Sequence, residues 1–204
     1  MGSVLKKIVV GTPYTWSPAV FFEQGQQGAW YEPSDLSTMY QDAEGTIPVL
    51  SDGDRVGKML DKSGNGNHLY QPDDSMRPTY RNYGATHWLD FDGVDDHLAS
   101  ENVIFPYNNM EISAAIYPTS STERGYIASV YNPTDLVSHL MYLEAPGSNA
   151  NQARYLCRLG GNGNPSVADF TESTKYIIAA TSTETNNTLR PNAARPDTRQ
   201  TISR

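Results

Sequence analysis

Four aspartates lie close together near the middle of the chain, and clustered carboxylates are the groups that bind calcium. Asp90 and Asp92 are two residues apart, so a strand would place them on one face, and Asp95 and Asp96 follow a glycine-centred corner. Two interpretations stay open for Asp92, Asp95 and Asp96. They could bind Ca²⁺, or they could accept hydrogen bonds from turn amides and remain solvated. We favour the second, because acidic turn residues are common without a metal.

Trp30 and Tyr31 are the second group that could contact a ligand. Large aromatic side chains mostly supply buried area, so we expect both to pack beneath the fold. If they were exposed, they could instead form a platform on which a sugar ring stacks, and we keep glycan contact as the alternative for this pair.

The remaining reactive side chains indicate neither zinc nor nucleophilic chemistry. The four histidines are scattered, and none forms a His-Glu-x-x-His pair. The single cysteine, Cys157, lies near two leucines, which indicates a small buried hydrophobe. The glycine-rich run at residues 160–165 lacks the Gly-Lys-Ser/Thr ending of a phosphate-binding loop, and we interpret it as a turn. We therefore expect no resident cofactor and no enzyme activity.

Composition indicates the fold class. The 204 residues include 16 Gly, 13 Pro and 13 Tyr, and 38% are hydrophobic, which suits many short strands and predicts an all-β protein. A formal charge of -8 argues against a nucleic-acid partner. The apolar run Ile8–Val10 is too short for a signal peptide or a membrane span. We expect a soluble protein, made without export and without membrane insertion.

Two segments must position the candidate groups. Asp61–His68 alternates Gly with Ser and Asn, which predicts a compact turn that leads into a strand at His68–Tyr70. The segment Trp88–Leu98 predicts a strand, a tight turn and a second strand, with Trp88, Leu89 and Phe91 in the core. Further strands are expected at residues 125–131, 139–143, 153–159, 167–170 and 176–181.

These two motifs, in this order, resemble the opening of laminin-G-like, concanavalin A-like jelly rolls, and the resemblance covers about Gly57 to Thr181. It implies a β-sandwich with its next core strand at residues 110–119 and a later one at 176–181, and calcium sites do occur in such domains. The endoglucanase relatives of the fold carry Glu-x-Asp-x-Glu on one strand, and Asp90-Phe91-Asp92 lacks that pattern. The usual Tyr/Phe-Val-x-Gly hairpin after the last core strand is also missing, so the sandwich is either incomplete or closed by a strand from elsewhere.

A longer resemblance begins at Gly28. The phrase Gly-x-Trp-Tyr-x-Pro-Ser-Asp-Leu-Ser-Thr-Met-Tyr-Gln-Asp, a Thr-Ile-Pro-Val step, the turn at Asp61 and Arg77-Pro78-Thr79-Tyr80 resemble the head of a family of tailed-phage and prophage virion proteins. In that family the segment precedes a laminin-G-like domain. The resemblance implies a virion structural protein: a fibre, a tail subunit or a head-decoration subunit.

These observations predict four regions. Residues 1–28 form an N-terminal arm for anchoring or assembly, 29–56 a lead-in segment, 57–181 the sandwich, and 182–204 a polar tail that is irregular or ordered by a partner. The β-branched run Val4–Val10 could pack on its own domain or add a strand to a neighbouring subunit.

The function expected from this layout is a phage virion structural protein. The first alternative is a carbohydrate-binding, receptor-recognition module of a tail fibre, and a glycan-degrading enzyme is a distant third. The expected partners are other virion proteins, a second copy of the chain and, under the first alternative, a host surface glycan. The expected location is the virion, after synthesis in the bacterial host cytoplasm.

Overall fold

The computed structural model describes residues 17–100, 109–119, 125–132, 137–144, 152–158, 166–169, 173–183 and 187–193. The run Val4–Val10, on which the arm prediction rests, lies outside these residues. The chain divides into two compact units, Met1–Ile104 and Phe105–Arg204, and each unit has its own strands. The predicted sandwich, 57–181, therefore spans the division between them.

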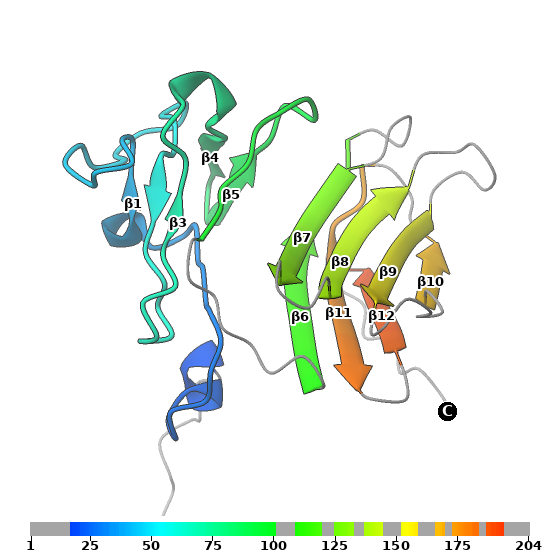
Figure 1. The fold of residues 1–204 in the computed structure, drawn as a ribbon. Helices are drawn as coiled ribbons and strands as arrows, with labels where there is room; N and C mark the ends of the chain where they lie inside the picture. The colour runs from blue at the N-terminus through cyan, green and yellow to red at the C-terminus, as the bar shows by residue number, and fades with distance from the viewer. Residues whose placement is uncertain are drawn as a thin grey trace, which may run out of the picture. The chain divides into compact units, whose positions relative to one another are not determined.

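The first unit is built from short elements (Figure 1). Three two-residue strands pair antiparallel in the order β1 (Met39–Tyr40), β2 (Lys58–Met59) and β3 (Leu69–Tyr70). A hairpin follows, made of β4 (Thr79–Tyr83) and β5 (Thr86–Asp90). Three 3-10 turns complete the unit: η1 (Pro18–Phe21), η2 (Leu36–Thr38) and η3 (Asp74–Met76).

The core of this unit consists of buried side chains from separate parts of the chain. They are Met39, Val49, Val56, Met59 and Tyr80, and half-buried Tyr31, Leu36, Leu69, Leu89 and Leu98 pack against them. Backbone hydrogen bonds from Gly53 to Tyr80, from Tyr80 to Asp54 and from Val56 to Pro78 bind the loop after Val49 along β4. A small core and many loop hydrogen bonds thus stabilise a unit with little regular structure.

The β4–β5 hairpin corrects one prediction. Leu89 lies opposite Tyr80 in the register and packs on the core, as expected. Trp88 is 38% exposed and Phe91 is 49% exposed, so placing these two in the core was wrong. Successive side chains of a strand point to opposite faces, so an inward Leu89 turns Trp88 outward. Phe91 lies beyond the end of β5, where the alternation no longer applies.

The second unit contains two antiparallel sheets that lie as two layers (Figure 1). One sheet has the order β10-β9-β8-β7, from strands β7 (Gly125–Asn132), β8 (Val137–Glu144), β9 (Gln152–Arg158) and β10 (Ser166–Asp169). The other has the order β12-β11-β6, from β6 (Asn109–Ile116), β11 (Tyr176–Thr183) and β12 (Asn187–Ala193). The strands predicted in this half of the chain are confirmed within a few residues.

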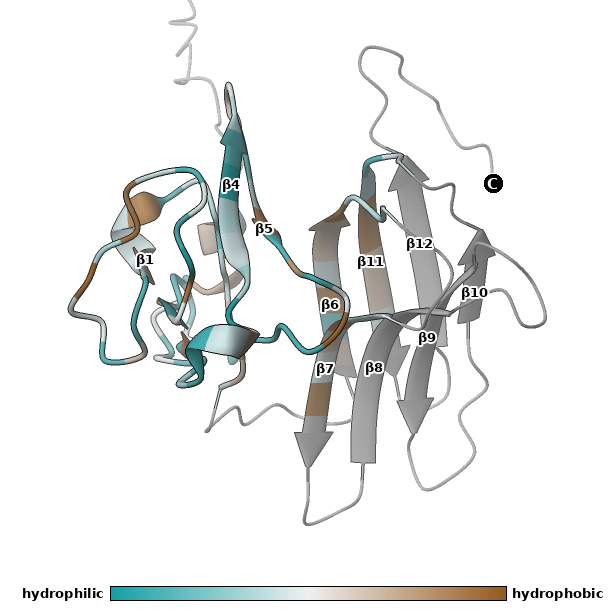
Figure 2. Ribbon diagram, turned by 90° about the horizontal axis from the view of Figure 1, so that it is seen from above, coloured by the Kyte–Doolittle hydropathy of each residue, from teal (hydrophilic) through white to brown (hydrophobic). Residues whose placement is uncertain are grey.

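The sheet of β6 and β11 has one apolar face. On β11, Tyr176, Ile178 and Ala180 are buried, whereas Ile177 between them is 53% exposed. On β6, Met110 is buried, and Figure 2 shows apolar residues along both strands. This period of two is what a strand with one covered face requires. The described residues contain no α-helix, so the chain is an all-β protein with antiparallel sheets.

The structure places a strand within the segment 182–204, where a polar tail was expected. Residues 187–193 form β12, which pairs antiparallel with β11 from Tyr176↔Ala193 to Ser182↔Asn187. A polar segment can form an edge strand because the ladder uses backbone groups, which every residue except proline supplies in full. The chain itself thus supplies the strand next to β11 that follows the last predicted core strand.

Candidate functional site

The Asp61–His68 turn binds a distant segment of the same unit, and Asp61 is its centre. The Asp61 Oδ1 atom accepts hydrogen bonds from the Trp30 N–H at 2.9 Å and the Ser63 N–H at 2.8 Å. Its Oδ2 atom accepts from the Asn67 N–H at 3.0 Å and the Ser63 hydroxyl at 2.7 Å. Asp61 is only 8% exposed. One carboxylate therefore closes its own turn and holds the backbone at Trp30.

The charged form of Asp61 is stabilised by these donors. Burial opposes ionisation, but the hydrogen bonds from Trp30, Ser63 and Asn67 together outweigh it and lower the pKa of the Asp61 carboxyl. At neutral pH the carboxylate is thus an acceptor, as its four donors require.

Two asparagine amides extend the contact toward the N-terminus. Asn67 Nδ2 donates to the Gly28 carbonyl at 2.7 Å, and Asn65 Nδ2 donates to the Gln26 and Gly28 carbonyls at 3.0 Å each. The turn reaches this geometry through Gly64 and Gly66, whose φ angles are +88° and +77°. Only glycine adopts such angles readily, which accounts for the Ser-Gly-Asn-Gly-Asn pattern. We call the set Gln26–Asp35 and Asp61–His68 the clasp.

Lys62 adds an ionic contact to the clasp. Its Nζ atom lies 2.7 Å from Glu32 Oε2 and 2.7 Å from Asp35 Oδ2. The hydrogen bonds from Lys62 lower the pKa of both carboxyls. Partial burial opposes the charge of Lys62, but the two carboxylates outweigh it and raise the Lys62 pKa. The same ammonium lies 4.6 Å from the centre of the Trp30 ring, which is a cation–π contact.

The structure places both candidate glycan-binding aromatics inside the clasp. The Tyr31 hydroxyl donates to the Asn67 carbonyl, and burial followed by the charge of Asp61 raises the Tyr31 pKa. The Tyr31 ring packs against the core, and the Trp30 ring lies under Lys62. Both residues thus have structural contacts. The sequence pattern did not predict that Glu32 and Asp35 would pair with Lys62, about thirty positions away.

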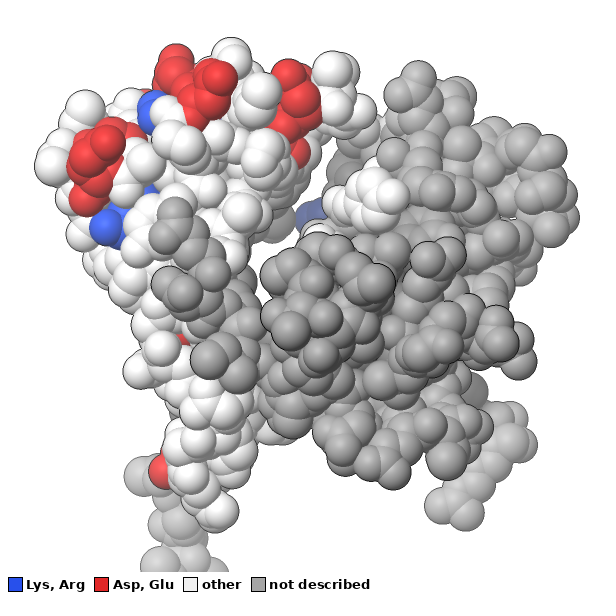
Figure 3. Space-filling view, viewed as in Figure 1, with Lys and Arg blue, Asp and Glu red and all other residues white. Residues whose placement is uncertain are grey.

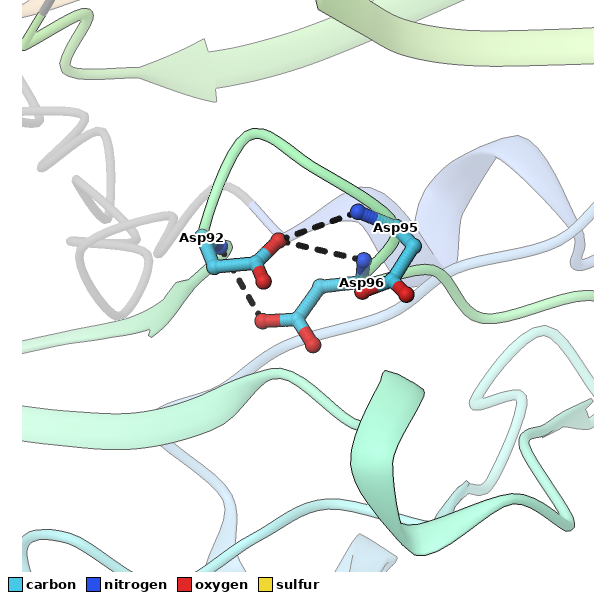
Figure 4. Close-up of side chains that lie close together, drawn as sticks. All are labelled: Asp92, Asp95 and Asp96. Carbon is cyan, nitrogen blue, oxygen red and sulfur yellow. Dashed lines mark hydrogen bonds between the residues drawn. The ribbon is translucent and has the colours of Figure 1, made fainter.

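The aspartates of the candidate calcium site do come together (Figure 4). One oxygen from each of Asp92, Asp95 and Asp96 lies within 4.8 Å of the others. Asp92 Oδ1 accepts hydrogen bonds from the N–H groups of Val94, Asp95 and Asp96, and Asp96 Oδ2 accepts from the Asp92 N–H at 3.0 Å. Asp90 is separate, with its carboxylate 3.5 Å from Arg81.

The protonation of this cluster follows from its contacts. The Val94 N–H, with those of Asp96 and Asp95, lowers the pKa of the exposed Asp92. Burial raises the pKa of Asp96, and its Oδ1 atom is buried without a hydrogen-bond partner. The spacing of the oxygens fits a calcium ion, whose ligands lie at about 2.3–2.6 Å. The turn is closed by hydrogen bonds from its own backbone N–H groups to the carboxylates of Asp92 and Asp96.

The described histidines also have local partners. His68 Nδ1 accepts a hydrogen bond from the Asp61 N–H at 3.0 Å, and His87 Nδ1 lies 2.6 Å from the Tyr80 hydroxyl. His97 lies beside the Gln71 amide. His139 and Cys157 lie on β8 and β9, and their side chains are outside the description. In the first unit, the His68 contact thus closes its own turn, and the His87 contact joins β5 to the buried Tyr80 of β4.

Charge on the first unit is divided among separate groups. Figure 3 shows Asp and Glu side chains in several clusters on the visible face, with Lys or Arg beside some of them. The ion pairs of Arg77 with Asp74 and of Arg81 with Asp52 belong to this pattern. Within the part of the chain that the structure describes, no helix has the length and hydropathy needed to cross a bilayer.

Comparison of the chain with protein-family models, with curated proteins and with solved structures found no match. The class that the fold defines is an all-β protein of two compact units with antiparallel sheets. The function proposed next depends on the clasp, on the sheets and on the sequence resemblance.

Proposed function

We propose that this chain is a structural subunit of a bacteriophage particle, a fibre, tail or head-decoration protein that carries a β-sandwich of the concanavalin A-like, jelly-roll kind. The observation that carries the proposal is the clasp. The phrase from Gly28 to Asp35 and the turn Asp61–His68 contribute to the resemblance with phage virion proteins, and these two pieces are hydrogen-bonded to each other. The residues that carry the resemblance thus include the ones that hold the segment from Gly28 to Asp35 against the turn Asp61–His68.

The second unit supports the sandwich part of the proposal. Its two antiparallel layers, of four and three strands, have the general architecture that a laminin-G-like domain requires. The jelly-roll connectivity itself is part of the proposal. Its closing strand is β12, which lies in the segment where the family hairpin is missing from the sequence.

The clasp gives the proposed arm a fixed base. A subunit that attaches to a particle through an N-terminal segment must transmit force from that segment to its folded part. The hydrogen bonds of Asp61, Asn65 and Asn67 bind the backbone at residues 26–30 to the first unit. The proposed arm is thus followed directly by a segment that is hydrogen-bonded to the Asp61–His68 turn.

The alternative, a carbohydrate-binding module, has less support from these contacts. A stacking platform needs an open aromatic face, whereas Trp30 lies under Lys62 and the Tyr31 hydroxyl is bonded to Asn67. A glycan array separates the two functions. If the chain is a structural subunit, substitution of Trp30 or Tyr31 is expected to abolish binding to no saccharide on the array.

The experiment is incorporation into particles. A tagged chain is expressed in cells that form the phage from a genome lacking the native gene, and the particles are then banded on a density gradient. The full chain is expected with the particles, and a deletion of residues 1–11 is expected to remain soluble and unbound. Deletion of residues 195–204 is the control of similar length and is expected to incorporate. A 1–11 deletion that incorporates at the full level would refute the anchoring role.

A further inference from the structure

The described strands of the second unit form two sheets with four edges, and three of these edges carry features that discourage pairing. Strand β7 has a register shift between Tyr126 and Ala128, β10 has only four residues, and β12 contains Pro191, which has no N–H to donate. Bulges, short strands and prolines at an edge are the devices by which natural sheets avoid unwanted partners.

Strand β6 has none of these features. It pairs with β11 over eight residues without interruption, from Asn109↔Thr183 to Ile116↔Tyr176. Its sequence contains no proline, lysine or arginine, and Glu111 is its one charged residue. Among the described strands β11 is its only partner, although the facing sheet has one strand more. A long, regular and nearly uncharged edge is a template for a further strand.

We propose that the edge of β6 pairs with β6 of a second copy of this chain, so that the two three-stranded sheets join into one. A two-fold axis perpendicular to the sheet makes identical strands antiparallel and keeps each face on the same side. The inward row of β6, where Met110 is buried and Ile112, Ala114 and Ile116 are half-buried, then continues into the same row of the second copy. The contact thus extends an apolar face and exposes no new one.

The position of Glu111 is compatible with this symmetry. If the axis passes through Ile112, Glu111 lies opposite Ser113 of the second copy, and if it passes through Ser113, Glu111 lies opposite Ala115. In neither register do two identical carboxylates meet, and like charges directly opposite are the pairs that destabilise a sheet.

The inference rests on the proposed function only in expecting a homo-oligomer, and its test uses the purified chain without particles. Light scattering after size exclusion is expected to give twice the 22.5 kDa chain mass at about 100 µM, a concentration chosen because dimer formation follows mass action. Ser113→Glu places the new carboxylate opposite Glu111 of the second copy in the first register, and opposite the same substituted position in the second. It is therefore expected to reduce the mass to that of one chain. Ile177→Glu adds the same charge to the exposed face of β11, one strand away from the edge, and is expected to leave the dimer intact.

Cross-linking provides a readout that does not depend on how Ser113→Glu folds. Opposite Cβ atoms in an antiparallel pair are about 4.5–5.5 Å apart, close to the spacing that a disulfide spans. In a Cys157→Ser background, either Ile112→Cys or Ser113→Cys is expected to form a dimer under mild oxidation. A monomeric wild-type chain, a folded Ser113→Glu variant that remains dimeric, or failure of both cysteines to cross-link would overturn the inference. A monomer in which the N-terminal arm covers β6 is one such outcome.

Discussion

The carboxylate of Asp61 and the backbone N–H of Trp30 are joined by a 2.9 Å hydrogen bond across thirty-one positions of the sequence. Around this bond the Asp61–His68 turn and the Gln26–Asp35 segment form one structure, with Asn65, Asn67 and Lys62 each adding a contact. The turn therefore binds the Gln26–Asp35 segment of the same chain and also connects to β3.

Asp61→Ala is expected to lower the free energy of unfolding by roughly 2–3 kcal/mol, because it leaves the buried N–H group of Asn67 and the partly buried N–H groups of Trp30 and Ser63 without their acceptor. Chemical denaturation followed by tryptophan fluorescence measures the change. Asp73→Ala is the matched control, since the exposed Asp73 carboxylate accepts hydrogen bonds from Ser75 within its own turn, and a clearly smaller loss than that of Asp61→Ala is expected. Equal losses in the two variants would mean that Asp61 is no more than a local cap.

The ionic part of the clasp is expected to contribute only between acid and alkaline limits. Glu32 and Asp35 have lowered pKa values, so their stabilisation is present above the unfolded values of about 4 and is lost as pH falls through the folded values. The Lys62 pKa is raised, so its contribution is present below about 10.4 and is lost as pH rises through the folded value.

Lys62→Met is the variant that tests this window. These side chains are partly exposed, so the loss at pH 7 is expected to be about 1 kcal/mol or less and to shrink in 1 M salt. Melting curves from pH 3 to pH 11 measure it. A difference from wild type that is equally large at pH 3 would contradict the ionic account and indicate lost packing on Trp30.

Gly57→Ala is expected to destabilise the first unit by roughly 1–3 kcal/mol. An added Cβ would lie 2.6 Å from the Gln41 carbonyl oxygen, 2.8 Å from the Asp42 carbonyl carbon and 2.8 Å from Arg77 Nε, so the backbone at Gln41 and Asp42 must move. Gly125→Ala is the control, because its Cβ would meet nothing within 4 Å. A thermal melt that is unchanged in Gly57→Ala would show that the loop at Gln41 adjusts without cost.

The hairpin makes a prediction about two neighbouring apolar residues. Leu89→Ala is expected to cost about 2–3 kcal/mol because its side chain packs on the core, and Phe91→Ala about 1 kcal/mol or less because Phe91 is 49% exposed. Urea denaturation of both variants measures the difference. The reverse order would place Phe91 in the core and Leu89 outside it.

The aspartate cluster is tested with and without calcium. Because burial raises the Asp96 pKa, its charge opposes folding above the unfolded value of about 3.9, and this penalty disappears below it. In EDTA, Asp96→Asn is expected to be as stable as wild type or more stable at pH 7, with no gain at pH 3. Melting curves of the wild type in EDTA and in millimolar calcium are expected to coincide. A calcium-dependent rise of several degrees that Asp96→Asn abolishes would establish the ion site instead.

Local features of this fold were predictable from the sequence, and distant pairings were not. Glycine spacing predicted the turn before β3, and the resemblance to laminin-G-like domains predicted the strands at β6 and β11. The contacts of Lys62 with Glu32 and Asp35 join segments about thirty positions apart, which no local period encodes. Strand β12 was missed because most of its residues are polar and it contains a proline, so the weak alternation of Leu189, Pro191 and Ala193 was not interpreted as a strand.

Peptide mass spectrometry of purified particles tests the proposed function most directly. Particles from the bacterial culture that encodes this chain are banded twice, washed in high salt and digested, and peptides are counted against the known structural subunits. The account predicts peptides from both units of this chain in a fixed ratio to those subunits through every wash. Their recovery only from the unbound cell extract, with particles of normal composition otherwise, would contradict it.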